Sequence, residues 1–202
     1  MSRLSPDAGS RIGAGCLLFF SIFWLGFSIF WTFLAFQDNE GWQWLFGIPF
    51  ILIGLFLLSR VVIRWMSRAR VARPELNISN PAPRIGETFS VDYRQAFKTP
   101  AQVDRMAVEL IFHESATYRR GTDTYTKTHE KIVDYFDHPA RHFEAGETFL
   151  DHYQFTIPRD GMHSFSGNNN KLTWRIRVTV DISNWPTYVE DFPIDVRAER
   201  GW

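Results

Sequence analysis

The side chains best suited to chemistry gather in one short stretch of the second half of the chain. All six histidines follow residue 112, and the densest group lies between residues 137 and 152. Imidazole and carboxylate groups bind zinc and similar ions, and a hydrolytic enzyme could use the same groups as acids and bases. The candidate residues for a metal-dependent or hydrolytic site are His138, His142, Asp151 and His152.

The spacing of these candidates matches no closed zinc pattern. Pro139 follows His138 directly and disfavours the regular helix that would place His138 and His142 on one face. A paired-cysteine zinc site is excluded, because the chain contains a single cysteine, Cys16. The sequence also lacks a nucleophile elbow, a P-loop, a dinucleotide fingerprint and a His-Glu-x-x-His motif. We therefore expect a His-rich loop, no metal, no cofactor and no enzymatic activity.

Asp151 occupies an unusual position in a short internal repeat. Residues 86–89 and 146–149 both read Gly-Glu-Thr-Phe, and continuing the alignment places Asp151 where the first copy has Val91, on an apolar strand face. A carboxylate there is costly unless it is paired or near the strand end. A functional acid in a pocket is one interpretation. We expect instead that a bulge or a register shift turns Asp151 outward.

The first part of the chain contains two long apolar runs. No charged residue occurs from Ile12 to Phe36 or from Gly41 to Ser59. Each run has about the length of a helix that crosses a hydrocarbon core, roughly 20 residues. We predict transmembrane helices over residues 12–36 and 42–64, joined by a short external loop, residues 37–41. Because neither run contains a charged residue or a histidine, we expect no ion path within the membrane.

The arginines predict which side of the membrane the two ends occupy. Residues 1–74 contain seven arginines and three acidic residues, and the connecting loop contains neither Lys nor Arg. Short cytoplasmic flanks of membrane helices carry an excess of Lys and Arg. We therefore predict a multi-pass protein of the inner cell membrane with a cytoplasmic N-terminus, residues 1–11. A basic linker, residues 65–74, then leads to a cytoplasmic domain, residues 75–202.

The basic residues that follow the second apolar run form a candidate binding patch. Three of its arginines are spaced four residues apart, so a continuing helix would present them on one face. Such a patch could bind anionic lipid headgroups or a partner protein. An ordinary stop-transfer flank is the simpler interpretation, and we favour it. The patch comprises Arg60, Arg64, Arg68 and Arg70.

Two glycines in the second apolar run share one face of the predicted helix. Gly47 and Gly54 are seven residues apart. Small residues allow helices to pack closely in membranes, so this face could contact the first helix. Glycine is also common in membrane helices in general, and we favour that simpler explanation for both residues.

Beyond Pro74 the pattern changes from continuous apolar runs to alternation. Residues 172–182 alternate apolar and polar side chains, which is typical of a strand with one buried face. Turn residues separate this strand from similar short ones, so we predict an antiparallel, immunoglobulin-like β-sandwich. The polar, Thr-rich residues 119–129 are expected to form a long hairpin loop. An alternative is that exposed Tyr118 and Tyr125, with the paired Arg119 and Arg120, contact a partner. The other expected strands are residues 75–79, 89–93, 106–112, 129–136, 153–157 and 192–196.

Several short motifs of this domain resemble the arrestin family. Gly86-Glu87 precedes a strand, residues 155–158 end a strand with Phe-Thr-Ile-Pro, and residues 172–178 form a long strand with Trp174 inside it. The region 75–197 is similar to half of an arrestin-like sandwich. The whole chain is similar to bacterial two-helix membrane proteins, of uncharacterised function, that carry such a domain. The resemblance implies protein–protein scaffolding rather than catalysis, although true arrestins have two sandwiches instead of one.

The charge of the domain excludes one class of partner. Residues 75–202 contain 15 basic and 19 acidic residues, whereas nucleic-acid binding usually requires a basic face. The leading hypothesis is a scaffolding module that is anchored in the lipid bilayer and recruits a membrane or cytoplasmic protein. The alternatives are a metal-dependent or hydrolytic enzyme that uses residues 137–152, and an accessory subunit of a membrane transport complex.

Overall fold

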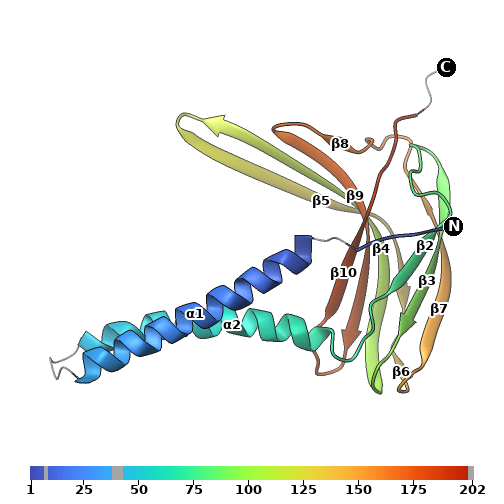
Figure 1. The fold of residues 1–202 in the computed structure, drawn as a ribbon. Helices are drawn as coiled ribbons and strands as arrows, with labels where there is room; N and C mark the ends of the chain where they lie inside the picture. Colours follow the sequence, from blue (N-terminus) through green and yellow to red (C-terminus); the bar gives the residue numbers. More distant parts are fainter. Residues whose placement is uncertain (7–8, 38–42, 200–202) are drawn as a thin grey trace. The chain divides into compact units, whose positions relative to one another are not determined.

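The computed structural model describes residues 1–6, 9–37 and 43–199, which fall into two compact units (Figure 1). One unit is helical and covers residues 8–67. The other combines residues 1–7 with residues 68–202 and is built from β-strands. Apart from Gln37, the loop expected over residues 37–41 lies outside the described residues.

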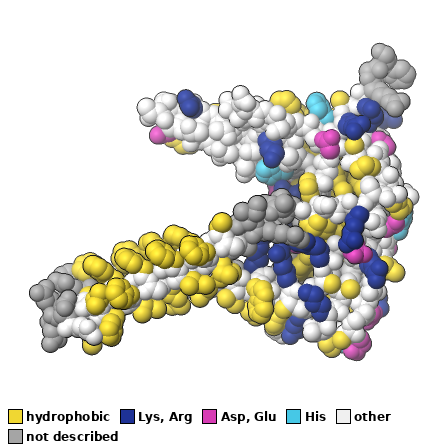
Figure 2. Space-filling view, in the orientation of Figure 1, with side chains coloured by type: hydrophobic (Ala, Val, Ile, Leu, Met, Phe, Trp, Pro, Cys, Tyr) yellow, Lys and Arg dark blue, Asp and Glu magenta, His cyan; other side chains and the backbone are white. Residues whose placement is uncertain are grey.

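The helical unit follows the two apolar runs. It consists of α1 (Gly9–Gln37), the short 3-10 helix η1 (Gln43–Phe46) and α2 (Gly47–Ser67). Within the described residues, two segments are long and apolar enough to cross a membrane, Gly15–Gln37 and Gly47–Ser67. Only 11% and 6% of their most apolar windows are buried, so most of this apolar surface is exposed. Their Leu, Ile and Phe side chains are mostly exposed, and these cover the helical unit in Figure 2.

The contact between α1 and α2 explains both glycines of the second helix. A Cβ on Gly47 would overlap the Thr32 hydroxyl, and a Cβ on Gly54 would lie 3.0 Å from Leu25 Cδ1. A larger residue at either position would push the helices apart. The explanation favoured from sequence, that these glycines only reflect the composition of membrane helices, is therefore wrong.

The β-unit is a mostly antiparallel β domain. In the described part of the chain, one sheet has four strands in the order β1-β2-β3-β7 and the other has β10-β9-β4-β5 as its main path. The short strands β6 and β8 pair with β4 and β9 and complete a six-stranded sheet. The first sheet contains β1 (Ser2–Arg3), β2 (Glu75–Ile78), β3 (Thr88–Ala96) and β7 (Thr148–Thr156). The second contains β4 (Ala101–Arg120), β5 (Asp123–His138), β6 (Arg141–Phe143), β8 (Phe165–Ser166), β9 (Asn170–Ile182) and β10 (Tyr188–Ile194).

The core lies between the two sheets and uses the alternating residues of their strands. Every second residue of β9 from Trp174 to Ile182 is buried, as the alternation of residues 172–182 predicts. Trp174 packs on Phe112 of β4, with the ring centroids 5.0 Å apart, and its indole Nε1 donates to the Met162 carbonyl at 2.8 Å. Burial of such large side chains stabilises the domain by about 1.5–3 kcal/mol each.

The internal repeat Gly-Glu-Thr-Phe builds the same turn twice. Gly86 and Gly146 have φ values of 79° and 82°, a left-handed conformation that favours glycine. The next residue folds its carboxylate back over the turn in both copies. Glu87 Oε2 accepts from the Arg84 amide at 2.8 Å, and Glu147 Oε2 accepts from the Glu144 amide at 2.9 Å. The repeat therefore marks two equivalent strand starts, at β3 and β7.

The polar segment 119–129 differs from its prediction. Instead of a long loop, β4 and β5 continue through it and join at a turn around Gly121, whose φ is 66°. Tyr118 stacks on Tyr125 with centroids 5.8 Å apart. Thr and Tyr favour strands, but here both faces of the hairpin lie beyond the sandwich core, so no apolar alternation reveals them. We call this projection the arm: residues 113–131 together with residues 170–173 of β9 (Figure 1).

Candidate interaction surface

Of the four residues predicted as candidates for a metal-dependent or hydrolytic site, the structure brings His138 and Asp151 together. His138 ends β5, and its Nε2 lies 3.0 Å from Asp151 Oδ2 and 2.7 Å from Tyr153 Oη. Burial, with the Asp151 carboxylate adding to it, raises the pKa of the Tyr153 phenol. The phenol therefore stays protonated and acts as a hydrogen-bonding group, not as a nucleophile.

Asp151 does not turn outward as predicted. The pairing of β3 with β7 is regular, Asp151 lies opposite Tyr93, and it keeps the inward phase of Tyr153 and Phe155. The expected bulge is absent from this described strand pair because none is needed. Asp151 lies near the start of β7 with its side chain 34% exposed, and His138 is its partner, so the carboxylate is both paired and partly hydrated.

The other two candidates belong to separate pairs. His142 lies on β6, with Nε2 3.4 Å from Glu144 Oε1. His152 points to the opposite face of β7, where its Nδ1 lies 2.6 Å from Asp92 Oδ1. Within the part of the chain that the structure describes, no three His, Cys, Asp or Glu side chains are grouped in a way that could hold a metal ion.

The predicted arginine patch is divided between the two units. Because α2 ends at Ser67, Arg68 does not continue the helical face of Arg60 and Arg64. Arg68 Nη2 lies 3.1 Å from Glu190 Oε2, and the guanidinium of Arg70 lies 4.1 Å from the Trp185 ring. Arg68 and Arg70 thus contact Glu190 and Trp185 of the β-unit.

Glu190 binds two arginines of the linker, Arg68 and Arg73. Its side chain is 3% exposed and accepts from Arg68, from Arg73 Nη2 at 3.2 Å and from Tyr188 Oη at 3.1 Å. A buried carboxylate requires such compensation. The sequence contained a signal for this site, since Glu190 alternates in phase with the buried Tyr188 and Phe192.

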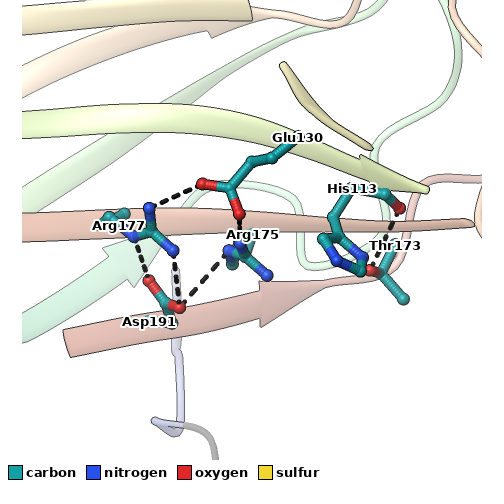
Figure 3. Close-up of polar contacts among 6 residues, drawn as sticks. All are labelled: His113, Glu130, Thr173, Arg175, Arg177 and Asp191. Carbon is teal, nitrogen blue, oxygen red and sulfur yellow. Dashed lines mark hydrogen bonds and ion pairs between the residues drawn. The ribbon is translucent and has the colours of Figure 1, made fainter. Parts of the chain in front are cut away.

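A second charged network lies on the outer face of the six-stranded sheet, where the arm begins (Figure 3). Arg177 of β9 donates Nη1 to Glu130 Oε1 of β5 at 2.7 Å and Nε to Asp191 Oδ1 of β10 at 2.8 Å. Arg175 also pairs with both carboxylates. The hydrogen bond with Asp191 is the main cause that raises the pKa of Arg177. Glu130 reaches across β4 to make these contacts, so the network joins β5, β9 and β10.

The arm beyond this network is polar and exposed. All residues from 123 to 132 of β5 are exposed. The strand alternates Tyr125, Lys127, His129 and Lys131 on one face with Thr124, Thr126, Thr128 and Glu130 on the other. Figure 2 shows few hydrophobic side chains over the arm, in contrast to the helical unit. The arm therefore presents mainly polar and charged side chains to solvent.

No protein-family model matches the sequence, and no curated protein matches it. The structure is similar to the crystal structure of Spo0M, a sporulation control protein from Bacillus subtilis, with a TM-score of 0.53 and 14% sequence identity. The match covers 65% of this chain and 51% of Spo0M, so the chain spans about half the length of that protein. At this identity the likeness concerns the fold alone, and it agrees with the mostly antiparallel β domain expected from the sequence.

Proposed function

We propose that this protein is a membrane-anchored scaffolding module without catalytic activity. In this proposal, α1 and α2 cross the cell membrane, the sandwich lies on its cytoplasmic side, and the arm binds a partner protein. The observation that carries the proposal is the arm. Its residues 118–131 are exposed, and the sandwich core does not include them. Binding residues are commonly placed on such projections from a rigid scaffold.

The exposed surface of the helices supports anchoring. Large apolar side chains such as Phe19, Phe23 and Trp31 are 75%, 62% and 63% exposed within the helical unit. Transfer of apolar area from water to lipid is favourable by about 25 cal/mol per Å². The lipid bilayer would therefore be the first partner of this chain.

The pairing of β1 supports a hairpin with both ends on one side. β1 precedes α1 and β2 follows α2, yet Ser2 pairs with Ile78, and the Leu4 amide donates to the Leu76 carbonyl at 2.9 Å. Arg3 also pairs with Glu75 at 2.7 Å. Two crossings return the chain to its starting side, as this pairing requires. The excess of arginine in both flanks favours the cytoplasm.

The likeness to Spo0M is consistent with a regulatory or scaffolding role, because that neighbour is a sporulation control protein. Anchoring would add a physical advantage. It confines the sandwich to the membrane surface and raises its effective concentration for partners located there.

The proposal is tested by shortening the arm in the full-length protein. Ser115 pairs directly with Thr128, so replacement of residues 116–127 by Asn-Gly removes Tyr125 and Lys127 and closes the hairpin with a two-residue turn. A photo-crosslinker at position 128 should capture a defined membrane or cytoplasmic protein in intact cells, and the shortened variant should lose it. The variant should remain in the membrane fraction with unchanged thermal stability.

Two outcomes would count against the proposal. Capture of the same proteins by the shortened variant would remove the arm from the function. Reporter fusions provide a second check: a fusion after residue 199 should report the cytoplasm and one inserted after Gln37 the outside. The opposite result would overturn the proposed location.

A further inference from the structure

We infer that the free edge of β5 binds an extended acidic segment of the partner as an additional antiparallel strand. This inference rests on the proposed function and specifies the chemistry of its partner. β5 ends the main path of the six-stranded sheet, and within the described residues β4 is the strand that pairs with it over residues 123–138. Its other edge therefore presents backbone N–H and C=O groups that an extended peptide can pair with.

The charge on one face of β5 selects the partner. Lys127, His129 and Lys131 follow each other at every second position, and Tyr125 extends the row towards the turn. All four are exposed. Side chains at every second position of an added strand have the same spacing, so acidic residues at alternating positions would face Lys127, His129 and Lys131.

Among the described residues, the acidic side chains near this row form no ion pair with Lys127 or Lys131. Glu130 points to the opposite face, where Arg175 and Arg177 hold its carboxylate. Glu114 of β4 lies opposite His129. Between residues 112 and 118 it is the acidic residue of β4 on the same face as the Lys127–Lys131 row. The ion pairs of the described residues involve neither Lys127 nor Lys131, so both ammonium groups remain available to a partner strand.

The same row discourages other occupants. Cations along an edge strand oppose pairing with apolar strands, which lack a group to neutralise them. A second copy of β5 paired antiparallel around His129 would place Lys127 of each copy opposite Lys131 of the other. The other face offers Thr124, Thr126 and Thr128, whose small side chains accommodate Thr, Ser or β-branched residues of an added strand.

Peptide binding to the full-length protein in nanodiscs tests this inference. The probe is a fluorescein-labelled peptide, Thr-Glu-Val-Glu-Thr-Glu-Val, and its binding is followed by fluorescence anisotropy. One control peptide carries Lys in place of Glu. The other carries N-methyl groups on alternate amides, so that one of its edges cannot donate hydrogen bonds. We expect the acidic peptide to bind at least about tenfold more tightly than either control.

Matched variants locate the site. Exchange of both Lys127 and Lys131 for Glu should weaken binding of the acidic peptide by about tenfold or more. The same charge change at Arg94 and Arg159, exposed residues outside the arm, should leave binding within about twofold. Since all four residues are on the surface, an unchanged melting temperature will show that both variants are folded.

The possible failures are distinguishable. Equal binding of the N-methylated peptide would reduce the interaction to charge alone and overturn strand addition, as would absence of binding. If the Lys127→Glu, Lys131→Glu variant still crosslinks the cellular partner through the arm, the proposed function stands and only the acidic strand is refuted.

Discussion

β9 and β5 are long strands of the same sheet, but they are stabilised in different ways. β9 buries every second side chain from Trp174 onwards, whereas β5 buries none between residues 123 and 132. The first strand is held by the core, and the second by its pairing with β4 and by surface contacts such as that between Thr117 Oγ1 and Thr126 Oγ1 at 3.0 Å. The comparison teaches that alternation reports burial of one face, not the strand conformation itself.

The largest expected difference concerns the two aromatic residues that mark these strands. Trp174→Ala should destabilise the domain by about 3–5 kcal/mol, because it opens a cavity and leaves the Met162 carbonyl without its donor. Tyr125→Ala should cost about 0.5 kcal/mol or less, because its ring is 45% exposed and contacts mainly Tyr118. Denaturant unfolding followed by far-ultraviolet circular dichroism measures both. A similar cost for the two variants would refute the division between core and arm.

The next difference compares two carboxylates that each pair with two arginines. Glu190→Leu should cost roughly 2–3 kcal/mol, since Arg68 and Arg73 lose a buried partner but remain about one-third exposed themselves. Glu130→Leu should cost about 1 kcal/mol or less, because that carboxylate is 37% exposed. The same unfolding experiment applies. A larger loss at Glu130 would mean that the outer network, rather than the linker contact, stabilises the domain.

The buried tyrosines predict a response to alkaline pH. Burial raises the pKa of Tyr93, Tyr153 and Tyr188 above the ordinary value of 10.0. The folded state therefore binds these protons more tightly than the unfolded state does. Their contribution to stability is complete below about pH 10 and is lost as the pH rises above it. Tyr153→Phe should flatten this loss, which melting temperatures at increasing pH will show. An unchanged slope would contradict the assigned environment of Tyr153.

The smallest effect is expected at the end of the arm. Thr126→Ala removes one exposed hydrogen bond to Thr117, so the unfolding free energy should change by about 0.5 kcal/mol or less. The corresponding change in the core, Val178→Ala, should cost about 2 kcal/mol or more, because Val178 has no exposed surface. Equal effects would show that the arm is part of the cooperative core.

Much of the architecture was predictable from particular residues. The uncharged runs predicted the helices, and the alternation of residues 172–182 predicted β9 and its buried face. The repeated Gly-Glu predicted two equivalent turns, because a glycine with positive φ followed by a carboxylate that caps the turn is a local property. Glu190 could also have been found, since a carboxylate in phase with buried residues requires a cation.

The arm, the environment of Asp151 and the contacts of the arginine patch were harder to predict. Residues 119–129 lack alternation because no core covers either face, so a strand there looks like a loop. Asp151 was expected to turn outward because its partner, His138, comes from the other sheet and is 13 positions away in the chain. The division of the arginine patch was equally hidden, because Arg68 and Glu190 are 122 residues apart.

The sequence by itself determined the apolar helices, the alternating core strands and the local turns, because each depends on the side chains of a short, continuous segment. Only the tertiary structure decided which charges are neutralised, which strand lies at the sheet edge and which cations remain available on β5. These properties depend on strand order and on partners distant in the chain, and a one-dimensional pattern does not specify them.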